Sequence, residues 1–312
     1  MINESKIFGI VIIISFCACR IYAQDNQRDI DKQSAPFDKE NATQKILAGQ
    51  TSDRLHAPES PGDSDLGEQL LLQPVNSYRP LSVYASGNGH WTSNAALTES
   101  DRLEDFFWRH NAGATFLPYL TGNLYGEISG TYGSYQYADN SNLDFDALDA
   151  GSGLVNIFPN LGNLSLSARY NYTRYSGSGE ELFSDHSVEL AAFKPIPLGL
   201  YHYFYFGWES DFSFDADPEY AKRHEHSITS GYHFSPAEKL SLEIYYRLAI
   251  NDYQSSDRTD LNHSFGASIG YHLRDNLLIR AATSFVVNDS DMSGSDYQAA
   301  TAGATAGIIL KF

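Results

Sequence analysis

Alternation of apolar and polar residues dominates the chain from Leu81 onward. In the stretch "KLSLEIYYRLAIN", one set of alternate positions holds mainly Leu and Ile, and the other holds Ser, Glu, Tyr, Arg and Asn. The stretches "NLSLSARYNYT", "NHSFGASIGYHL" and "NLLIRAATSFVV" divide in the same way. Successive side chains of a β-strand point to opposite faces, so this period of two predicts strands with one apolar and one polar face.

Twelve such runs can be counted, and we expect each to form one strand. They cover residues 81–96, 103–117, 122–137, 145–158, 163–176, 184–194, 200–213, 223–234, 239–251, 261–273, 276–288 and 298–312. The connections after every second strand are short, such as "PYLTG" and "RDN", whereas the others are longer or acidic, such as "SGSGEEL" and "NDSDMSGSD". An even number of strands with short turns at one end and longer loops at the other is typical of a bacterial outer-membrane barrel.

The charge on the two strand faces distinguishes a membrane barrel from a secreted β-sandwich or a β-solenoid. The apolar face carries no charged residue in the strand bodies, apart from the poorly patterned run 145–158 and the strand-end residues Glu104 and Lys194. Aromatic residues lie toward both ends of these strands: Trp91, Trp108, Trp208, Phe116, Tyr232, Phe234, Tyr271 and Phe312. This distribution predicts a lipid-facing band with aromatic girdles. The expected fold is all-β, a twelve-stranded antiparallel transmembrane up-and-down β-barrel over residues 79–312.

The first residues have the layout of a secretory signal. "MINESKIFGIVIIISFCACRIYAQD" has Lys6 near the start, then an apolar run and the small residue Ala23, so we expect a signal peptide over residues 1–23. Cys17 and Cys19, the only cysteines, fall inside it, which predicts a mature chain without disulfides. An uncleaved membrane anchor and a lipid-modified Cys19 are the alternatives.

Residues 24–78 are rich in Asp, Gln, Ser and Pro and poor in aromatic residues. Such a composition cannot bury enough apolar surface to offset the entropy of ordering, so we expect a disordered periplasmic segment. A tail that binds a partner is the alternative, and the sequence leaves open whether the segment plugs the barrel. The formal net charge of −18 makes nucleic acid an improbable partner.

The chain ends in "TAGIILKF", which resembles the C-terminal recognition signal of Gram-negative outer-membrane barrels. The matching residues are Thr305, Gly307, Leu310 and Phe312. The resemblance implies that the barrel-assembly machinery is a partner that reads this strand, and that the protein resides in the bacterial outer membrane. More loosely, the hairpin "HSITSGYHFSPAEKLSLEIYY" is similar to porin-like barrels and to the barrels of exopolysaccharide operons. That second likeness implies nothing about a substrate.

The polar face supplies the candidate pore-lining residues, which are Glu127, Arg169, Glu243, Arg247, Arg280, Tyr203 and Tyr245. Twelve tilted strands give a backbone radius of roughly 12 Å, much of which side chains fill. Small residues such as Gly113 and Gly266 favour an open lumen, whereas the tyrosines narrow it. We therefore expect a narrow passive channel for small hydrophilic solutes. A sealed structural or assembly-associated barrel, in which the charges pair with one another, is the alternative.

Four histidines, His110, His186, His226 and His263, lie on the apolar face near the predicted loop ends. We expect them to contact outer-membrane lipids and lipopolysaccharide at the outer rim.

Three of these histidines precede a serine, but adjacent strand residues point to opposite faces, so such a pair cannot form a nucleophile and its base. Only His233 and Ser235 share a face by spacing. We expect no catalytic residues and no enzyme, with a lipid-modifying enzyme as the third alternative. The acidic loop 288–296 has Ala300 where a calcium loop would close with Glu, so no metal and no cofactor are expected. The solute and the oligomeric state stay undetermined.

Overall fold

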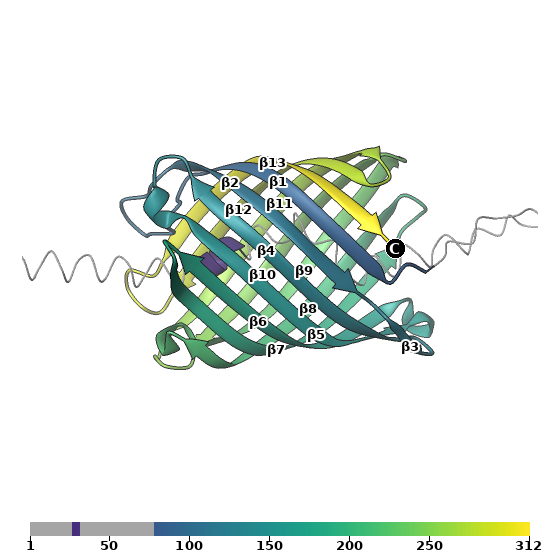
Figure 1. Ribbon diagram of the computed structural model, residues 1–312, viewed down its shortest axis with the longest axis horizontal. Coiled ribbons are helices and arrows are strands. Elements are labelled where there is room, and N and C mark those ends of the chain that lie inside the picture. Colours follow the sequence, from purple (N-terminus) through teal and green to yellow (C-terminus); the bar gives the residue numbers. More distant parts are fainter. Residues whose placement is uncertain (1–26, 32–77) are drawn as a thin grey trace, which may run out of the picture.

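Twelve long antiparallel strands close into one barrel in the computed structural model, which describes residues 27–31 and 78–312 (Figure 1). The strands are β1 (Leu81–Thr92), β2 (Asp105–Phe116), β4 (Leu124–Tyr137), β5 (Phe145–Phe158), β6 (Leu164–Gly177), β7 (Glu180–Pro197), β8 (His202–Asp217), β9 (Arg223–Ala237), β10 (Leu240–Tyr253), β11 (Thr259–Arg274), β12 (Leu277–Ser290) and β13 (Tyr297–Lys311). Each of these strands pairs with the next one in this series. The barrel closes where β1 pairs with β13, from Ser82 opposite Lys311 to Thr92 opposite Thr301. The predicted fold is confirmed.

Two local features differ from the pattern-based expectation. A short additional strand, β3 (Tyr119–Thr121), pairs with β4 inside the first turn. The connection "SGSGEEL", expected as a longer loop, is mostly strand, and only Ser178 and Gly179 join β6 to β7. Both residues have positive φ, 54° and 82°, as the turns of two-residue hairpins often require.

The two faces of the barrel wall differ in chemistry as predicted. Apolar side chains point outward and stay exposed, for example Ile128 at 58 %, Ile244 at 59 % and Phe265 at 50 %. Charged residues of the opposite parity, such as Glu127 and Arg223, are buried in the lumen. A closed barrel with an apolar exterior is suited to lipid rather than to water. In the part of the chain that the structure describes, no helix is long and apolar enough to span a membrane.

The two ends of the barrel are defined by their connections. At the turn end, the backbone N–H of Phe312 donates to the carbonyl of Leu81 at 2.8 Å, and the N–H of Leu81 donates back at 3.2 Å. At the loop end lie the segment 93–104 between β1 and β2 and the other connections of that side, among them 138–144 and 291–296. In outer-membrane barrels the short turns face the periplasm and the loops face outward.

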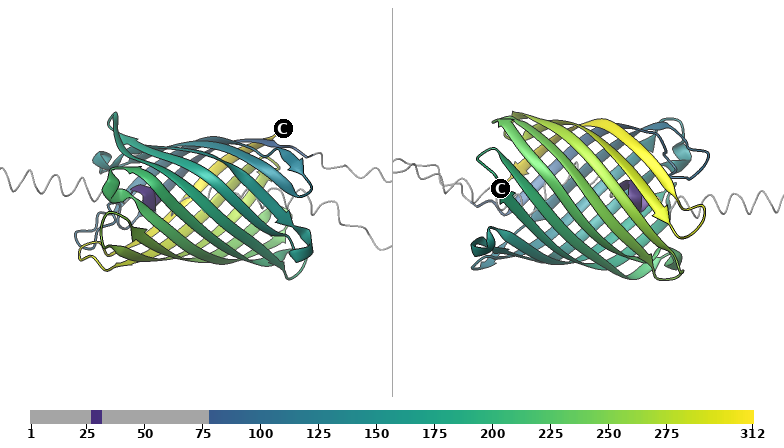
Figure 2. Two further views of the ribbon diagram at one scale, coloured as in Figure 1. Left: turned by 90° about the horizontal axis from the view of Figure 1, so that it is seen from below. Right: turned by 180° about the vertical axis from the view of Figure 1, so that it is seen from behind.

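Residues 27–31 form a single helical turn inside the loop-end half of the lumen, drawn in purple (Figure 1, Figure 2). We call them the resident segment. They belong to the stretch 24–78, for which a disordered periplasmic segment is expected, and the structure describes these five residues of it as helical. Composition indicates only how much apolar surface a segment can bury by itself, whereas charged partners on the barrel wall hold the resident segment. The expected signal peptide over 1–23 lies outside the described residues, as do residues 24–26 and 32–77.

Candidate functional site

Two carboxylates of the resident segment are bound by the lumen wall. Asp29 accepts a hydrogen bond from Nη2 of Arg223 at 2.5 Å and one from the hydroxyl of Tyr297 at 2.8 Å. Asp31 accepts from Nη2 of Arg109 at 3.1 Å and from the hydroxyl of Tyr135 at 2.6 Å. Charge-assisted hydrogen bonds of this kind are among the stronger ones in proteins. We call the two sets of wall groups the Asp29 site and the Asp31 site.

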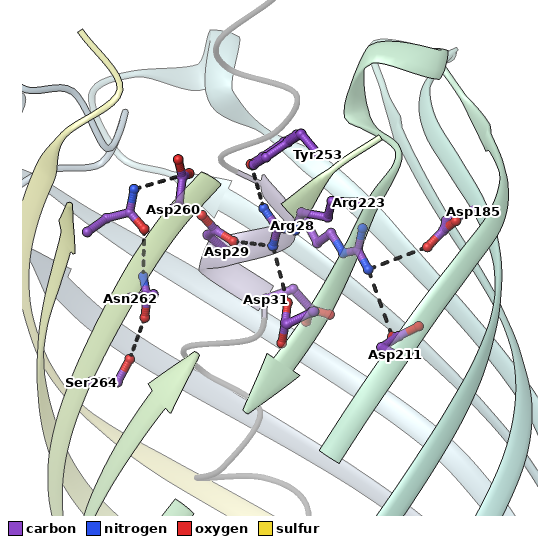
Figure 3. A network of polar contacts seen from close by, with 12 residues as sticks. Arg28, Asp29, Asp31, Asp185, Asp211, Arg223, Tyr253, Asp260, Asn262 and Ser264 are labelled. Carbon is purple, nitrogen blue, oxygen red and sulfur yellow. Dashed lines mark hydrogen bonds and ion pairs between the residues drawn. The ribbon is translucent and has the colours of Figure 1, made fainter. Parts of the chain in front are cut away.

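The guanidinium of Arg28 in the resident segment faces acidic residues on two strands of the barrel wall. Nη2 of Arg28 lies 3.4 Å from Oδ2 of Asp185 on β7 and 3.9 Å from Oδ2 of Asp211 on β8, as Figure 3 shows. Asp185 is fixed in turn by the hydroxyl of Ser213, which donates to its Oδ1 at 2.5 Å. Asp185 and Asp211 form the Arg28 site. Its longer distances indicate a weaker hold than that of the two carboxylate sites.

A second layer of polar side chains supports the Asp29 site. Arg223 is fully buried and donates to the hydroxyl of Tyr253 at 2.9 Å. Asn262 donates to the hydroxyl of Tyr297 at 3.2 Å and to Oδ1 of Asn288 at 3.2 Å. Such supporting bonds fix the orientation of the groups that touch the carboxylate. The wall at this level is therefore a preorganised polar surface.

The apolar residue of the resident segment, Ile30, packs between two hydrophobic clusters of the lumen. One cluster contains Phe107 and Tyr135, and the other contains Val286 and Tyr297. Ile30 also lines a small pocket together with residues of β1, β2, β4, β12 and β13 and of the 93–104 loop. The segment is thus held by both charge and apolar contact.

The middle of the lumen contains two ion-pair networks. Arg169 donates from Nε to Glu127 at 2.8 Å and from Nη1 to Glu189 at 3.0 Å. Arg247 pairs with Glu225 on β9. Among the predicted pore-lining residues, the structure therefore brings Arg169 and Glu127 together, while Arg247 takes a partner that the sequence did not single out.

Nearer the turn end, the lumen is lined by aromatic side chains. Tyr205 donates from its hydroxyl to Oε1 of Glu243 at 2.6 Å. Tyr203 and Tyr245 pack against a cluster of buried residues that includes Phe193 and Tyr205. Arg280 lies on the lumen face of β12, opposite Thr305 of β13. All seven predicted pore-lining residues thus lie on the lumen face; their role in conduction stays a prediction.

Glycines on the lumen face carry the large side chains of neighbouring strands. A Cβ at Gly231 would lie 2.3 Å from Cζ of Tyr205, and one at Gly153 would lie 2.8 Å from Cγ of Arg169. Each long side chain crosses over the glycine of the adjacent strand and reaches an acceptor on the strand beyond it. Gly113 and Gly266 are covered in the same way, by Tyr84 and Tyr245. Tyrosine rings therefore fill the space directly over these two glycines, and the open lumen that the small residues favour stays a prediction.

The four rim histidines point away from the lumen. His186 is bonded to the hydroxyl of Tyr170 at 2.6 Å, and His263 to that of Tyr246 at 2.8 Å. His110 and His226 are exposed on the outer face. Their expected contact with lipid and lipopolysaccharide stays a prediction.

Two histidines are hydrogen-bonded to serines. His233 and Ser235 are 3.1 Å apart near the turn end, as their spacing suggested. The pair of Ser210 and His226, 2.8 Å apart, was not foreseen because the two residues lie opposite each other on β8 and β9. Ser210 is only 2 % exposed, so its hydroxyl is shielded from lipid. Among the described residues no group of His, Cys, Asp and Glu side chains could hold a metal ion.

The residues of the predicted assembly signal lie on β13 and at the terminus. Thr305 is buried and faces the lumen. Leu310 and Phe312 are exposed on the outer face, at 41 % and 62 %. This alternation fits the recognition signal, whose reading by the assembly machinery stays a prediction.

The sequence interpretation missed the residues that hold the resident segment. Asp185, Asp211 and Glu225 were not singled out as lumen charges, and Arg223 lies at the first position of a strand. Parity alone would have placed all four on the lumen face. Asp185 alternates with the rim histidine His186, Arg223 and Glu225 alternate with His226, and Asp211 shares the face of Tyr203. The residues that the wall binds, Arg28, Asp29 and Asp31, could not be found from the strand alternation because they belong to no strand.

Comparison with solved structures establishes the fold. An outer-membrane channel from Pseudomonas putida F1 superposes with a TM-score of 0.55 at 10 % identity, covering 75 % of this chain and 96 % of that chain. The chain has the fold of bacterial outer-membrane β-barrels. Two further matches have lower TM-scores. The translocator domain of the autotransporter NalP from Neisseria meningitidis gives 0.40 at 12 % identity, covering 86 % of this chain and 96 % of that one. The KdgM porin in complex with disordered oligogalacturonate gives 0.40 at 10 % identity, covering 71 % and 97 %.

The sequence itself matches no protein-family model and no curated protein. The fold, together with the apolar exterior of the barrel, agrees with the predicted location in the bacterial outer membrane. Function has to be argued from the lumen.

Proposed function

We propose that the barrel is a narrow passive channel for small hydrophilic solutes. The observation that carries this proposal is the room inside the barrel, whose loop-end half holds the helical turn 27–31. A helix with its side chains is about 10–12 Å across. A barrel filled by its own wall side chains would have no space for such a turn.

The arrangement of the wall side chains supports a water-filled path. Tyr205 and Arg169 lie along the wall, over Gly231 and Gly153, and bond to other wall residues. Side chains that lie along the wall extend less toward the barrel axis. The tyrosines near the turn end support the narrowness, because their bulky rings line the lumen there.

A sealed structural barrel is the second candidate. The aromatic cluster around Phe193 and Tyr205, together with the ion pairs of Arg169, favours it. In that case the polar residues of the lumen form hydrogen bonds and ion pairs with one another rather than with water. A lipid-modifying enzyme ranks below both, because the hydroxyl of Ser210 beside His226 is buried.

Liposome swelling tests the channel directly. Full-length protein carrying Arg28→Asp, which weakens the hold of the helical turn 27–31 on the lumen wall, should admit small sugars when it is reconstituted into liposomes. The rate should fall steeply as the sugar grows from a pentose to a trisaccharide. Replacing Tyr203 and Tyr245 together by Ala should raise the rate for the larger sugars, since these residues narrow the path. Absence of swelling with every sugar in the Arg28→Asp background, with and without the two tyrosine substitutions, would contradict the channel if gel mobility shows both chains to be folded.

A further inference from the structure

We propose that the loop-end half of the lumen is a binding site for a peptide segment with the side-chain order Arg-Asp-x-Asp, and that residues 27–31 are its tethered occupant. By filling the site, the resident segment closes the barrel at this end. The closing role rests on the proposed channel function, whereas the binding site does not.

The first argument is complementarity of charge. The Asp29 site offers Arg223 and Tyr297, and the Asp31 site offers Arg109 and Tyr135. The Arg28 site offers two carboxylates instead. Each charge of the segment thus meets its opposite, so the wall distinguishes this order of charges from the reversed one.

The second argument is the distribution of the three sites around the barrel. The Arg28 site is formed by β7 and β8, and the Asp29 site by β9 and β13. The Asp31 site is formed by β2 and β4, with the hydroxyl of Tyr175 on β6 3.5 Å from Asp31. Contacts in several directions at one level hold the segment across the lumen rather than along one wall. A segment held in this way obstructs the path.

The third argument is burial. The side chains of Arg109, Asp185 and Arg223 are at most 5 % exposed when the segment is in place. A buried charge that loses its partner is costly, so a segment without these charges would fit poorly. Ile30 adds an apolar anchor between the two hydrophobic clusters. The tether keeps the segment at a high effective concentration, so that release requires a change in its charges or in those of the wall.

A charge-swap cycle tests the site. Arg28→Asp places a carboxylate against Asp185 and Asp211, and adding Asp211→Arg to it restores an opposite pair. Ile30→Cys in each chain reports the position of the segment through its rate of labelling by a membrane-impermeant maleimide. We expect labelling at least tenfold faster in Arg28→Asp than in the parent, and a return toward the parent rate in the double variant.

The labelling experiment carries its own controls. The same chains without Ile30→Cys give the background from any other thiol, and heat-modifiable gel mobility shows that each barrel is folded. Arg28→Asp lies in the segment, so the strands of that variant are unchanged. If the double variant fails to fold, Asp31→Asn provides the second test, because it removes the charge that the Asp31 site binds without altering the wall. Equal labelling rates in the parent, Arg28→Asp and Asp31→Asn would overturn the proposal.

Conductance measured on the same chains separates this inference from the proposed function. Larger currents in Arg28→Asp than in the parent would support the closing role. Labelling that responds to charge while every chain stays silent would support the binding site and overturn the channel.

Recognition in trans checks the ligand class. Acetyl-Arg-Asp-Ile-Asp-amide should block Arg28→Asp at least tenfold better than the charge-reversed acetyl-Asp-Arg-Ile-Arg-amide. Equal block by both peptides would overturn the claim that the wall reads the order of charges.

Discussion

At the scale of single residues, the lumen is organised by pairs of a glycine and a long side chain. Tyr205 crosses Gly231 to reach Glu243, and Arg169 crosses Gly153 to reach Glu127. The composition of the lumen face could be predicted from the sequence, but this use of glycine could not. The pairing depends on which residues stand opposite each other on neighbouring strands, and alternation within one strand contains no such information.

The glycine pairs give a prediction about stability. Gly231→Ala would place a Cβ 2.3 Å from Cζ of Tyr205 and displace the ring, so we expect a loss of about 1–3 kcal/mol in the free energy of unfolding. Gly207→Ala on the lumen face of β8 is the matched control, because its Cβ would lie 3.7 Å from Cβ of Thr229, an ordinary contact. Urea unfolding followed by tryptophan fluorescence measures both. Equal losses would contradict the role given to Gly231.

At the scale of the elements, the sequence predicts most of the structure. All twelve strands lie where the alternation predicts them, because burial on one face only constrains every second residue. The ends were less predictable: β7 continues to Pro197 and β8 to Asp217, beyond the runs 184–194 and 200–213. Strands that extend past the membrane no longer need an apolar outer face, so the pattern weakens while the backbone pairing continues.

The parity of β10 gives a prediction at this scale. Ile244→Arg puts a charge on the lipid-facing side and should cost about 2–4 kcal/mol at mid-bilayer. Ser268→Arg is the matched control, since Ser268 lies on the lumen face of β11 opposite Glu243, at almost the same depth. We expect it to be tolerated if the lumen contains water. Unfolding free energies in lipid vesicles provide the comparison, and equal costs would argue against a transmembrane barrel.

At the scale of the whole molecule, three layers follow one another along the lumen. The resident segment and its three sites occupy the loop-end half, the networks of Arg169 and Arg247 lie in the middle, and tyrosines line the turn end. The sequence predicts the second and third layers from parity. The first layer depends on five residues outside every strand, whose partners are fixed only when the barrel has closed. The proposed central channel runs through all three layers in turn.

The ion selectivity of the lumen tests that account most directly. Glu127→Gln and Glu243→Gln remove two carboxylates, while Arg169 keeps Glu189 at 3.0 Å and Tyr205 keeps an oxygen acceptor at residue 243. Reversal potentials across a salt gradient should be measured for the double variant and its parent, each with and without Arg28→Asp. If water fills the lumen, the double variant that also carries Arg28→Asp shows steady ohmic currents shifted toward anions relative to Arg28→Asp alone, and the double variant keeps a melting temperature close to that of the parent. Silence in all four chains, together with a large fall in the melting temperature of the double variant, would contradict the channel and indicate a sealed barrel.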